Sequence, residues 1–389
     1  MKVRKLLALA AVGLLAAACS GGGGSPAPSA AASLGATEGE LNLIIWAGYA
    51  ERGEVDPNFD WVTPFEDATG CKVNTIEMTD SNNGVSLMQS GNYDGGSFSG
   101  DATTRLMVGG IVAPVNTALT PNYANIFEGL KNKPHNSMNG QPYGIPHGRG
   151  PNLLAWNTEE LTEAPTSWDV VWEGGVDGGG KVSVYDSSIY IADAALRLMN
   201  TQPDLGIANP YQLNQAQFDA AIDLLEKQRD AGALYWGTYS DQMQSFSSGE
   251  VTTGTSWQFQ VDLLKAEPQP IEAVLPDEGS TGWSDTWMIA KNAAHPNCMY
   301  KWMDHMASAE ANGQATVWFG EAATSPQACE YAETISEGHC ERMHATDEAY
   351  FDKVWYWATP QADCADTDSA TTCKTQDDWV SAWNTLRGE

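Results

Sequence analysis

The stretch Leu41–Tyr49, LNLIIWAGY, decides the fold. It begins as a short apolar strand and ends on two aromatic residues, Trp46 and Tyr49, which the small residues Ala47 and Gly48 separate. In open α/β sheets, ligands bind where a buried strand ends and its carboxyl end opens into a turn. The stretch therefore predicts an α/β fold with a ligand site beside Trp46 and Tyr49.

Strand and helix patterns alternate along the rest of the chain, which is typical of α/β proteins. Apolar or alternating runs predict strands at residues 72–78, 93–99, 181–185, 251–257 and 287–290. Amphipathic runs with caps and glycine stops predict helices at residues 56–69, 84–90, 101–109, 168–172, 193–199, 217–230 and 296–306.

Four later stretches are expected to face the same crevice as Leu41–Tyr49. They are residues 99–101, the YDSSIY run from Tyr185, the Ser256-Trp257 pair, and a turn made of Gly282, Trp283, Ser284 and Asp285. Tryptophan faces attract an ammonium group, and a carboxylate paired to it adds direction. Together they would form a box for an organic cation. The alternatives are that the aromatic residues are core side chains, that Asp285 caps a turn, and that Ser99 caps a helix.

Length and charge limit the possible functions. A chain of 389 residues exceeds one ordinary core, so two lobes are expected. The formal net charge of −30 argues against binding nucleic acid or anionic lipid through a basic face. Most of the carboxylates are interpreted as a solubilising surface.

The N-terminus is typical of a bacterial lipoprotein signal peptide. Basic residues precede an apolar run, Leu6–Leu15, and Ala16, Ala17 and Ala18 lead to Cys19. We therefore expect cleavage after residue 18 and lipid on Cys19, although Ala16 replaces the usual larger aliphatic residue. Residues 19–39 are rich in Gly, Ser, Ala and Pro, which predicts a flexible tether. The protein is expected in the periplasm or on the outer face of the cytoplasmic membrane.

Six further cysteines suggest three disulfides in an oxidising compartment. Fifteen pairings are possible; the short spacings favour Cys329–Cys340 and Cys364–Cys373, which leaves Cys71–Cys298. No C-x-x-C motif occurs and the histidines have no metal-ligand spacing, so neither a metal nor a cofactor is expected.

Several of these segments, taken in order, resemble the extracellular solute-binding proteins of bacterial ABC importers, in the polyamine (spermidine/putrescine) branch. The resemblance covers about residues 40–360, and residues 51–74 and the YIADAAL run from Tyr190 are most similar to an uncharacterised polyamine-type subgroup. The matching pieces are the strand with Trp46 and Tyr49, the segment 93–99, Tyr143–Pro146, Ser167-Trp168, the segment 249–257 and Trp283–Asp285.

This resemblance implies a two-lobe α/β periplasmic-binding-protein clamshell (type II) that closes on its ligand by hinge motion. Lobe one would comprise residues 40–147 and 284–330, and lobe two residues 148–283 and 331–389. The implied partners are a small amine and the permease subunits of the importer, and we expect a monomer. The ligand-binding residues that it implies are Trp46, Tyr49, Ser99, Trp257, Trp283 and Asp285.

The family pattern is incomplete in this sequence. Gly48 stands where the family often has an acidic or polar residue, and Asp101 stands at an aromatic position. The family's acidic pair aligns with Ser187 and Tyr190, and Asp186 is only adjacent to it. A second ammonium site would therefore be rebuilt from Asp101 or Asp186, or be absent, and Tyr190 is a further expected ligand-binding residue.

Four functions follow from these observations. The first is capture of a polyamine for import, and the second is the same role with a monocationic or zwitterionic ligand. An enzyme on this fold is the third, but the sequence has no G-x-S-x-G, H-E-x-x-H, G-x-G-x-x-G or P-loop motif to support it. The fourth is a surface sensor or adhesion lipoprotein.

Overall fold

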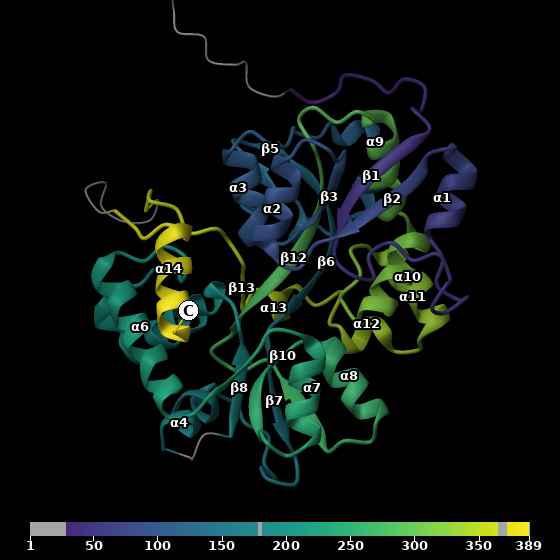
Figure 1. Cartoon of the computed structure of the whole chain (residues 1–389). Coiled ribbons are helices and arrows are strands. Elements are labelled where there is room, and N and C mark those ends of the chain that lie inside the picture. The colour runs from purple at the N-terminus through teal and green to yellow at the C-terminus, as the bar shows by residue number, and fades with distance from the viewer. Residues whose placement is uncertain (1–28, 178–180, 365–371, 389) are drawn as a thin grey trace, which may run out of the picture.

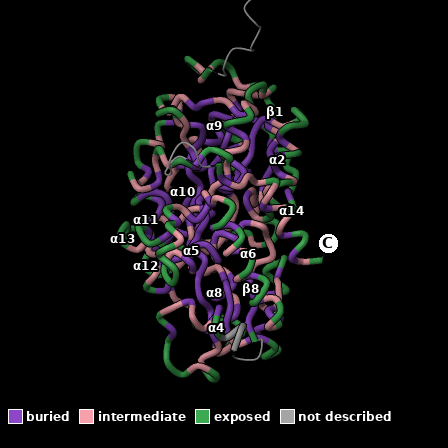
Figure 2. Tube along the Cα trace, turned by 90° about the vertical axis from the view of Figure 1, so that its left-hand side faces the viewer, coloured by how far each residue is buried: buried purple, intermediate pink, exposed green. Residues whose placement is uncertain are grey.

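A computed structural model describes residues 29–177, 181–364 and 372–388. Each of its two lobes is built on one β-sheet with helices packed around it (Figure 1). Buried segments run through the middle of the molecule, and exposed segments lie along its outer edge (Figure 2). The predicted signal peptide and the lipidated Cys19 lie outside the described residues.

The first sheet has the strand order β13-β12-β3-β1-β2, and β6 pairs with β12 beside this path. Strands β1, β2 and β3 are parallel, whereas β12 runs antiparallel to β3 and β6. Leu43 of β1 packs into one core cluster and its neighbour Ile44 into another, so both faces of the strand are buried. The strand bounds are β1 Glu40–Ile45, β2 Lys72–Glu77, β3 Gly95–Phe98, β6 Gly144–Pro151, β12 Ser280–Ile289 and β13 Val354–Tyr356.

The second sheet has the strand order β11-β7-β10-β8-β9. Its strands β8, β9 and β10 are parallel, and β7 runs antiparallel to β10 and β11. A separate two-stranded sheet joins β4 to β5. The strand bounds are β4 Ser137–Met138, β5 Gln141–Pro142, β7 Leu153–Asn157, β8 Val182–Tyr185, β9 Leu234–Trp236, β10 Thr253–Ser256 and β11 Ile271–Val274.

The helices follow the predicted order, with shifted ends. The helix expected from residue 56 begins only at Val62, because the preceding loop is held by an isolated bridge between Arg52 and Asp60. The helix bounds are α1 Val62–Thr69, α2 Ser81–Gln89, α3 Gly100–Val108, α4 Asp169–Asp177, α5 Ile191–Thr201, α6 Gln215–Asp230, α7 Tyr239–Ser247, α8 Gln258–Ala266, α9 Pro296–Met306, α10 Ala309–Phe319, α11 Pro326–Ile335, α12 His339–Arg342, α13 Glu348–Phe351 and α14 Gln376–Arg387. Short 3₁₀ turns cover Thr117–Leu119, Pro121–Asn125, Glu128–Leu130, Ser188–Tyr190 and Pro203–Leu205.

The chain passes between the sheets more than once. Strand β6 ends at Pro151 in the first sheet and β7 begins at Leu153 in the second, and the chain returns between β11 and β12. Residues 282–285 were expected to form a turn, but they lie inside β12, where they pair with β6. A β-bulge between Asp285 and Thr286 is the local irregularity at this point. Because residues 282–285 belong to a strand, the directions of their side chains are fixed more firmly than they would be in a turn.

The predicted flexible tether ends earlier than residue 39. Ala31 and Leu34 pack against the core of the first lobe, and the Ala31 carbonyl accepts a hydrogen bond from Asn116. The Glu38 carboxylate accepts hydrogen bonds from the backbone N–H groups of Asn297 and Cys298. These are free N–H groups in the first turn of α9, so Glu38 caps that helix and fixes the segment to the lobe.

The expected boundary at residue 331 is also wrong as a division between lobes. Strand β13 pairs in parallel with β12, so Val354–Tyr356 belong to the first sheet. Helix α14 instead packs on α6 of the second lobe, beside which it lies in Figure 1. The C-terminal segment therefore contributes to both lobes.

The three disulfide pairings favoured by spacing are confirmed. Cys71 is bonded to Cys298, with 5.8 Å between the Cα atoms, and this bridge ties the start of β2 to α9. The other two bonds join Cys329 to Cys340 and Cys364 to Cys373, and each closes a short loop. None of the described helices is both long and apolar enough to cross a bilayer.

Candidate ligand-binding site

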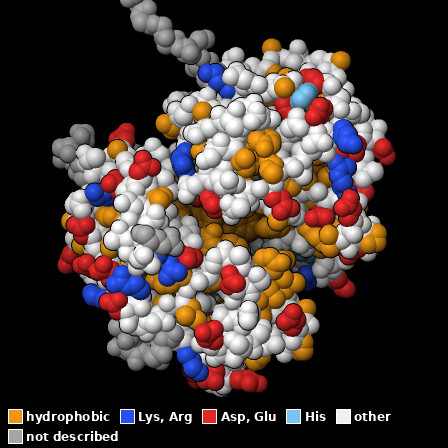
Figure 3. Space-filling view, in the orientation of Figure 1, with side chains coloured by type: hydrophobic (Ala, Val, Ile, Leu, Met, Phe, Trp, Pro, Cys, Tyr) orange, Lys and Arg blue, Asp and Glu red, His pale blue; other side chains and the backbone are white. Residues whose placement is uncertain are grey.

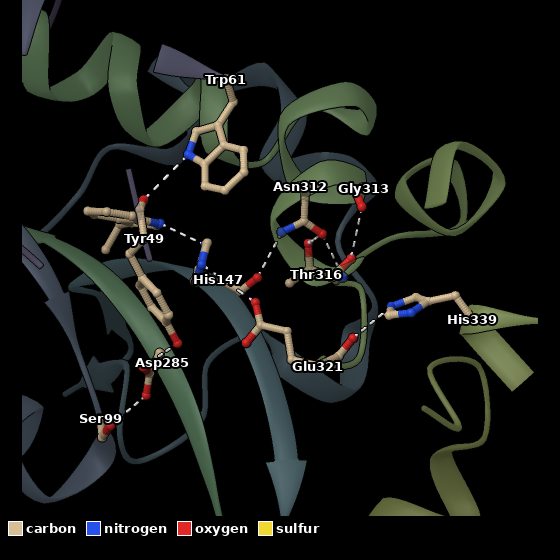
Figure 4. Close-up of polar contacts among 12 residues, drawn as sticks. Tyr49, Trp61, Ser99, His147, Asp285, Asn312, Gly313, Thr316, Glu321 and His339 are labelled. Atoms are coloured by element: carbon tan, nitrogen blue, oxygen red, sulfur yellow. Dashed lines mark hydrogen bonds and ion pairs between the residues drawn. The ribbon is translucent and has the colours of Figure 1, made fainter. Parts of the chain in front are cut away.

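The centre of the candidate site is the carboxylate of Asp285, which is only 2% exposed. One of its oxygens accepts a hydrogen bond from the Ser99 hydroxyl at 2.6 Å. The other accepts a hydrogen bond from the Tyr49 hydroxyl at 2.8 Å. Figure 4 shows the three side chains meeting from separate segments of the first lobe. Three residues that are far apart in the sequence thus hold one carboxylate in a fixed orientation.

The parallel strands explain why these residues meet. Tyr49 follows β1 and Ser99 follows β3, and β1 and β3 are adjacent parallel strands whose carboxyl ends share one edge of the sheet. Strand β12 lies antiparallel beside β3, which brings Asp285 to the same edge. Ser99 is also the residue that precedes α3, but its side chain does not cap that helix. Its hydroxyl is directed to Asp285 instead, so the alternative of a helix cap is wrong.

Burial is the main influence on the acidity of Asp285. Burial raises the pKa of its carboxyl to about 6, and the hydrogen bonds from Ser99 and Tyr49 oppose that shift. Burial and the nearby Asp285 charge raise the pKa of the Tyr49 phenol well above its usual value, so the phenol stays protonated as a donor. No Lys or Arg side chain among the described residues pairs with Asp285. The site is therefore anionic and lacks an internal counter-charge.

The Tyr49 ring is held in place from two sides. Its centroid lies 4.4 Å from that of His147 and 4.6 Å from that of Phe319, which it meets edge to face. The Nδ1 atom of His147 lies 3.0 Å from the indole nitrogen of Trp287. Because an indole N–H can only donate, Nδ1 is the acceptor and the neutral ring carries its proton on Nε2. Burial lowers the pKa of His147 to about 3, which agrees with a neutral ring.

An aromatic wall closes the second lobe's side of the cleft; it consists of Tyr185, Trp236, Trp257 and Trp357. Tyr185, Trp236 and Trp257 end or follow the parallel strands β8, β9 and β10, so all three lie at one sheet edge. The Tyr185 ring centroid lies 5.4 Å from that of Trp257 and 5.9 Å from that of Trp357. The Trp257 indole N–H donates to Asn152 at 2.9 Å, which fixes the orientation of the ring.

The aromatic wall and the Asp285 centre are linked by Trp283 and Phe319. Trp283 is two residues before Asp285 on β12, so both side chains lie on one face of that strand. Its ring meets Phe319 edge to face at 6.2 Å, and Phe319 packs against the cores of both lobes. In Figure 3 a hollow lined with hydrophobic side chains crosses the face between the two lobes. The cleft is thus apolar along its walls and acidic at one end.

Trp46 and Asp101 lie close to this centre without contacting Asp285. Trp46 follows β1 and packs, half-buried, against both core clusters of the first lobe. Asp101 begins α3 and accepts a hydrogen bond from the Ser81 hydroxyl at 2.9 Å. Burial raises the pKa of Asp101, and its charge contributes to the raised pKa values of both Asp285 and Tyr185. The Asp101 charge therefore acts on Asp285 in one lobe and on Tyr185 in the other.

Asp186 is not a free carboxylate, contrary to the expectation from sequence. One of its oxygens accepts a hydrogen bond from the Trp383 indole N–H at 3.0 Å. The other pairs with the Arg387 guanidinium at 3.1 Å. Both partners belong to α14, so the C-terminal helix neutralises this position.

Tyr190 belongs to the core of the second lobe and does not face the Asp285 centre. Its ring stacks on Trp172, and its hydroxyl accepts a hydrogen bond from Gln228. It is the last residue of a 3₁₀ turn that leads directly into α5, and the adjacent Ile191 is fully buried. That packing turns Tyr190 inward.

Sequence reasoning missed several residues of the site. Tyr185 lies in the YDSSIY run that the sequence singles out, but nothing there indicates that its ring stacks on Trp357. Trp236, Phe319, His147 and Glu321 carry no local signal beyond residue type. Within the described ranges, no three His, Cys, Asp or Glu side chains come close enough together to hold a metal ion.

Comparisons with known proteins identify the family of the chain. Residues 60–339 match a family model described as bacterial extracellular solute-binding protein. The spermidine/putrescine-binding periplasmic protein 1 of Haemophilus influenzae is 25% identical over 284 residues, which are 72% of this chain and 73% of that protein. The putrescine/agmatine-binding protein of Pseudomonas aeruginosa is 22% identical over 284 residues, 67% of this chain and 75% of the relative.

A solved structure extends the comparison to nearly the whole fold. It is the spermidine/putrescine ABC transporter substrate-binding protein of Streptococcus pneumoniae, with a TM-score of 0.68 at 16% identity. The match covers 90% of this chain and 97% of that structure. The two-lobe periplasmic-binding-protein fold expected from the sequence is therefore confirmed.

Proposed function

The chain belongs to the family of bacterial extracellular solute-binding proteins, and on that premise we propose that it captures a small organic amine of the putrescine or spermidine type. The captured amine is delivered to the permease of an ABC importer. Proteins of this family serve transport and are not enzymes, so the cleft has to hold its ligand reversibly. Its affinity then depends on how well the cleft replaces the water around the ligand's charges.

One observation carries the proposal: Asp285 is a buried carboxylate with two hydroxyl donors and no basic partner among the described residues. A buried carboxylate is costly when it has no counter-charge. An ammonium group supplies that charge and can donate three hydrogen bonds. Tyr49 and Ser99 are already in place, so the carboxylate does not have to reorient when the amine binds.

The aromatic wall suits the rest of such a ligand. Methylene groups of an extended amine gain from burial against apolar surface at about 25 cal/mol per Å². An ammonium over a tryptophan face gains about 0.5–2 kcal/mol. Trp257 follows β10 of the second sheet and Trp283 lies on β12 of the first, and both line the same small cavity.

A second candidate is a ligand with a single positive charge. The observation that favours it is the ion pair between Asp186 and Arg387, which removes one of the carboxylates that a second ammonium would need. Isothermal titration with putrescine, butylamine and 4-aminobutyrate separates the two candidates. Putrescine binding at least tenfold tighter than both the monocation butylamine and the zwitterion 4-aminobutyrate supports the diamine. Equal or tighter binding of either of these two ligands contradicts it.

The affinity for an amine is expected to fall as the pH is lowered through about 6. The pKa of Asp285 is raised to about 6 in the ligand-free protein, and only the ionised carboxylate pairs with an ammonium. Above that pH Asp285 is charged and adds no further pH dependence to the affinity. Below it, the affinity falls by up to tenfold per pH unit. Titrations from pH 8 to pH 4.5 measure this, and a flat profile would rule out Asp285 as the pairing group.

We also propose that the mature protein is anchored by lipid on Cys19. The support is the signal-like sequence before that residue. Replacing Cys19 by serine should move the protein from the membrane fraction to the soluble fraction of the producing cells. Unchanged membrane association of that variant would contradict the anchor.

A further inference from the structure

A second carboxyl group is buried near Asp285 and takes no part in the interactions described above. The Glu321 side chain is 0% exposed, and neither of its oxygens has a hydrogen-bond partner among the described residues. Figure 4 shows it reaching from the loop after α10 toward His147, on the side where Tyr49 and Asp285 lie. A buried carboxyl group without partners is costly, so its retention calls for a physical reason.

Strand register places Glu321 on the same face as Asp285. Asp285 is paired with Gly148 across the β6–β12 ladder, and side chains of paired residues lie on one face of a sheet. Gly148 has no side chain, and a Cβ atom built there would lie 2.2 Å from the Glu321 carboxyl carbon. The Glu321 carboxyl therefore occupies the space that a side chain of residue 148 would fill, next to Asp285.

Glu321 also borders the aromatic part of the cleft. It lines a small cavity together with Gly150, Trp257 and Trp283. The volume of this cavity, about 20 Å³, is enough for one water molecule. Asp285 does not line the cavity itself, but Trp283, which does, lies on the same face of β12 as Asp285.

The groups that face Glu321 do not neutralise it. The His147 ring carries its proton on Nε2, which lies 3.5 Å from the nearer Glu321 oxygen, beyond a good hydrogen bond. His339, on α12, contacts only the backbone carbonyl of Glu321. Arg149 and Arg342 also line the cavity, but Arg149 pairs with Glu348, and Arg342 donates to the Glu337 carbonyl and the Ser336 hydroxyl.

Two acidic groups, Tyr49 and Asp285, face Glu321 from its other side. Tyr49 is neutral, and Asp285 carries the same negative charge that an ionised Glu321 would carry. Burial first, and the Asp285 charge second, raise the pKa of Glu321 well above its usual value. Both influences favour the protonated form of Glu321 in the ligand-free protein.

We propose that Glu321 is a second carboxyl group of the amine site and that it gives up a proton when an ammonium group binds between it and Asp285. The inference rests on the proposed function, because it assigns a role within the same site. The step balances as Glu321–COOH plus a bound ammonium giving Glu321–COO⁻, the same ammonium and one proton released to the solvent. The ammonium replaces the proton as the positive charge that the two carboxyl groups share.

Isothermal titration of the wild-type protein with putrescine at pH 7.5, in phosphate and in Tris, tests this directly. The two buffers take up a proton with different enthalpies, so the difference in observed heat counts the protons released. At this pH Asp285, with a pKa of about 6, is already ionised and contributes little. We expect the release of between about one half and one proton per putrescine, because the ammonium offsets the burial and the Asp285 charge that raise the pKa of Glu321.

The variant Glu321→Gln should release almost no proton and bind putrescine about tenfold more weakly or worse, with an unfolding midpoint no lower than that of the wild type. Glu330→Gln, an exposed position on α11, is the matched control and should behave as the wild type. Equal heats in both buffers for a wild type that binds putrescine would overturn the role of Glu321 and leave the proposed function standing. Absence of binding by any amine would overturn both.

Discussion

Asparagine in place of Asp285 is expected to reduce the affinity for putrescine at least about 100-fold. The substitution keeps the size of the side chain but removes the charge that pairs with the ammonium. Losing one partner of a buried, hydrogen-bonded charge pair costs about 2–5 kcal/mol, and 2.7 kcal/mol corresponds to a factor of 100. One of the Ser99 and Tyr49 hydroxyls can still donate to the amide oxygen, and the other can accept a hydrogen bond from the amide NH2 group, so the variant should fold. Titration at pH 7.5 gives the affinity, and circular dichroism checks the fold.

The matched control is Asp277→Asn, which makes the same chemical change at an exposed position just before β12. It should leave the affinity within about a factor of two, because exposed charges interact weakly through solvent. If Asp285→Asn folds and binds putrescine as tightly as Asp277→Asn does, the carboxylate does not hold the ligand.

Alanine in place of Trp257 is expected to weaken putrescine binding by a factor of about 10 to 100. The change removes a face for the ammonium or the methylene chain, together with the packing of that ring against Tyr185 and Trp236. It also leaves Asn152 without its indole donor. The same titration measures the loss.

Phenylalanine at the same position separates these contributions. Trp257→Phe keeps an aromatic face but loses the hydrogen bond to Asn152. It should recover most of the affinity that alanine loses. Equal losses in both variants would mean that binding depends on the hydrogen bond from Trp257 to Asn152 and the orientation that it fixes, and not on contact between the ring and the ligand.

The convergence of Tyr49, Ser99 and Asp285 could be predicted from sequence because it depends on strand order. Apolar runs identify β1 and β3, and the carboxyl ends of adjacent parallel strands meet at one edge. The local setting of Asp285 could not be read in the same way. Gly282, Trp283 and Ser284 are compatible with a turn, and only their pairing with β6 and β13, which are distant in sequence, makes them part of a ten-residue strand.

The errors at Asp186 and Tyr190 have a similar cause. Asp186 is paired by residues of α14 that are 197 and 201 positions away, so no local pattern indicates that its charge is taken. Tyr190 lies shortly after the polar pair Ser187-Ser188, which is typical of an exposed segment. The start of α5 nevertheless directs the Tyr190 side chain into the core. Glu321 has no sequence signal at all, because its burial depends on Gly148 leaving space across the lobe.

The most direct test of the central claim is isothermal titration of the wild-type domain after any co-purified ligand has been removed by unfolding, dialysis and refolding. Putrescine or spermidine at pH 7.5 should bind one site with a dissociation constant of about 1 μM or lower, equivalent to about −8 kcal/mol. A refolded protein with native circular dichroism that gives no binding heat with either amine, in buffers of different ionisation enthalpy and at two temperatures, would contradict the amine site built on Asp285.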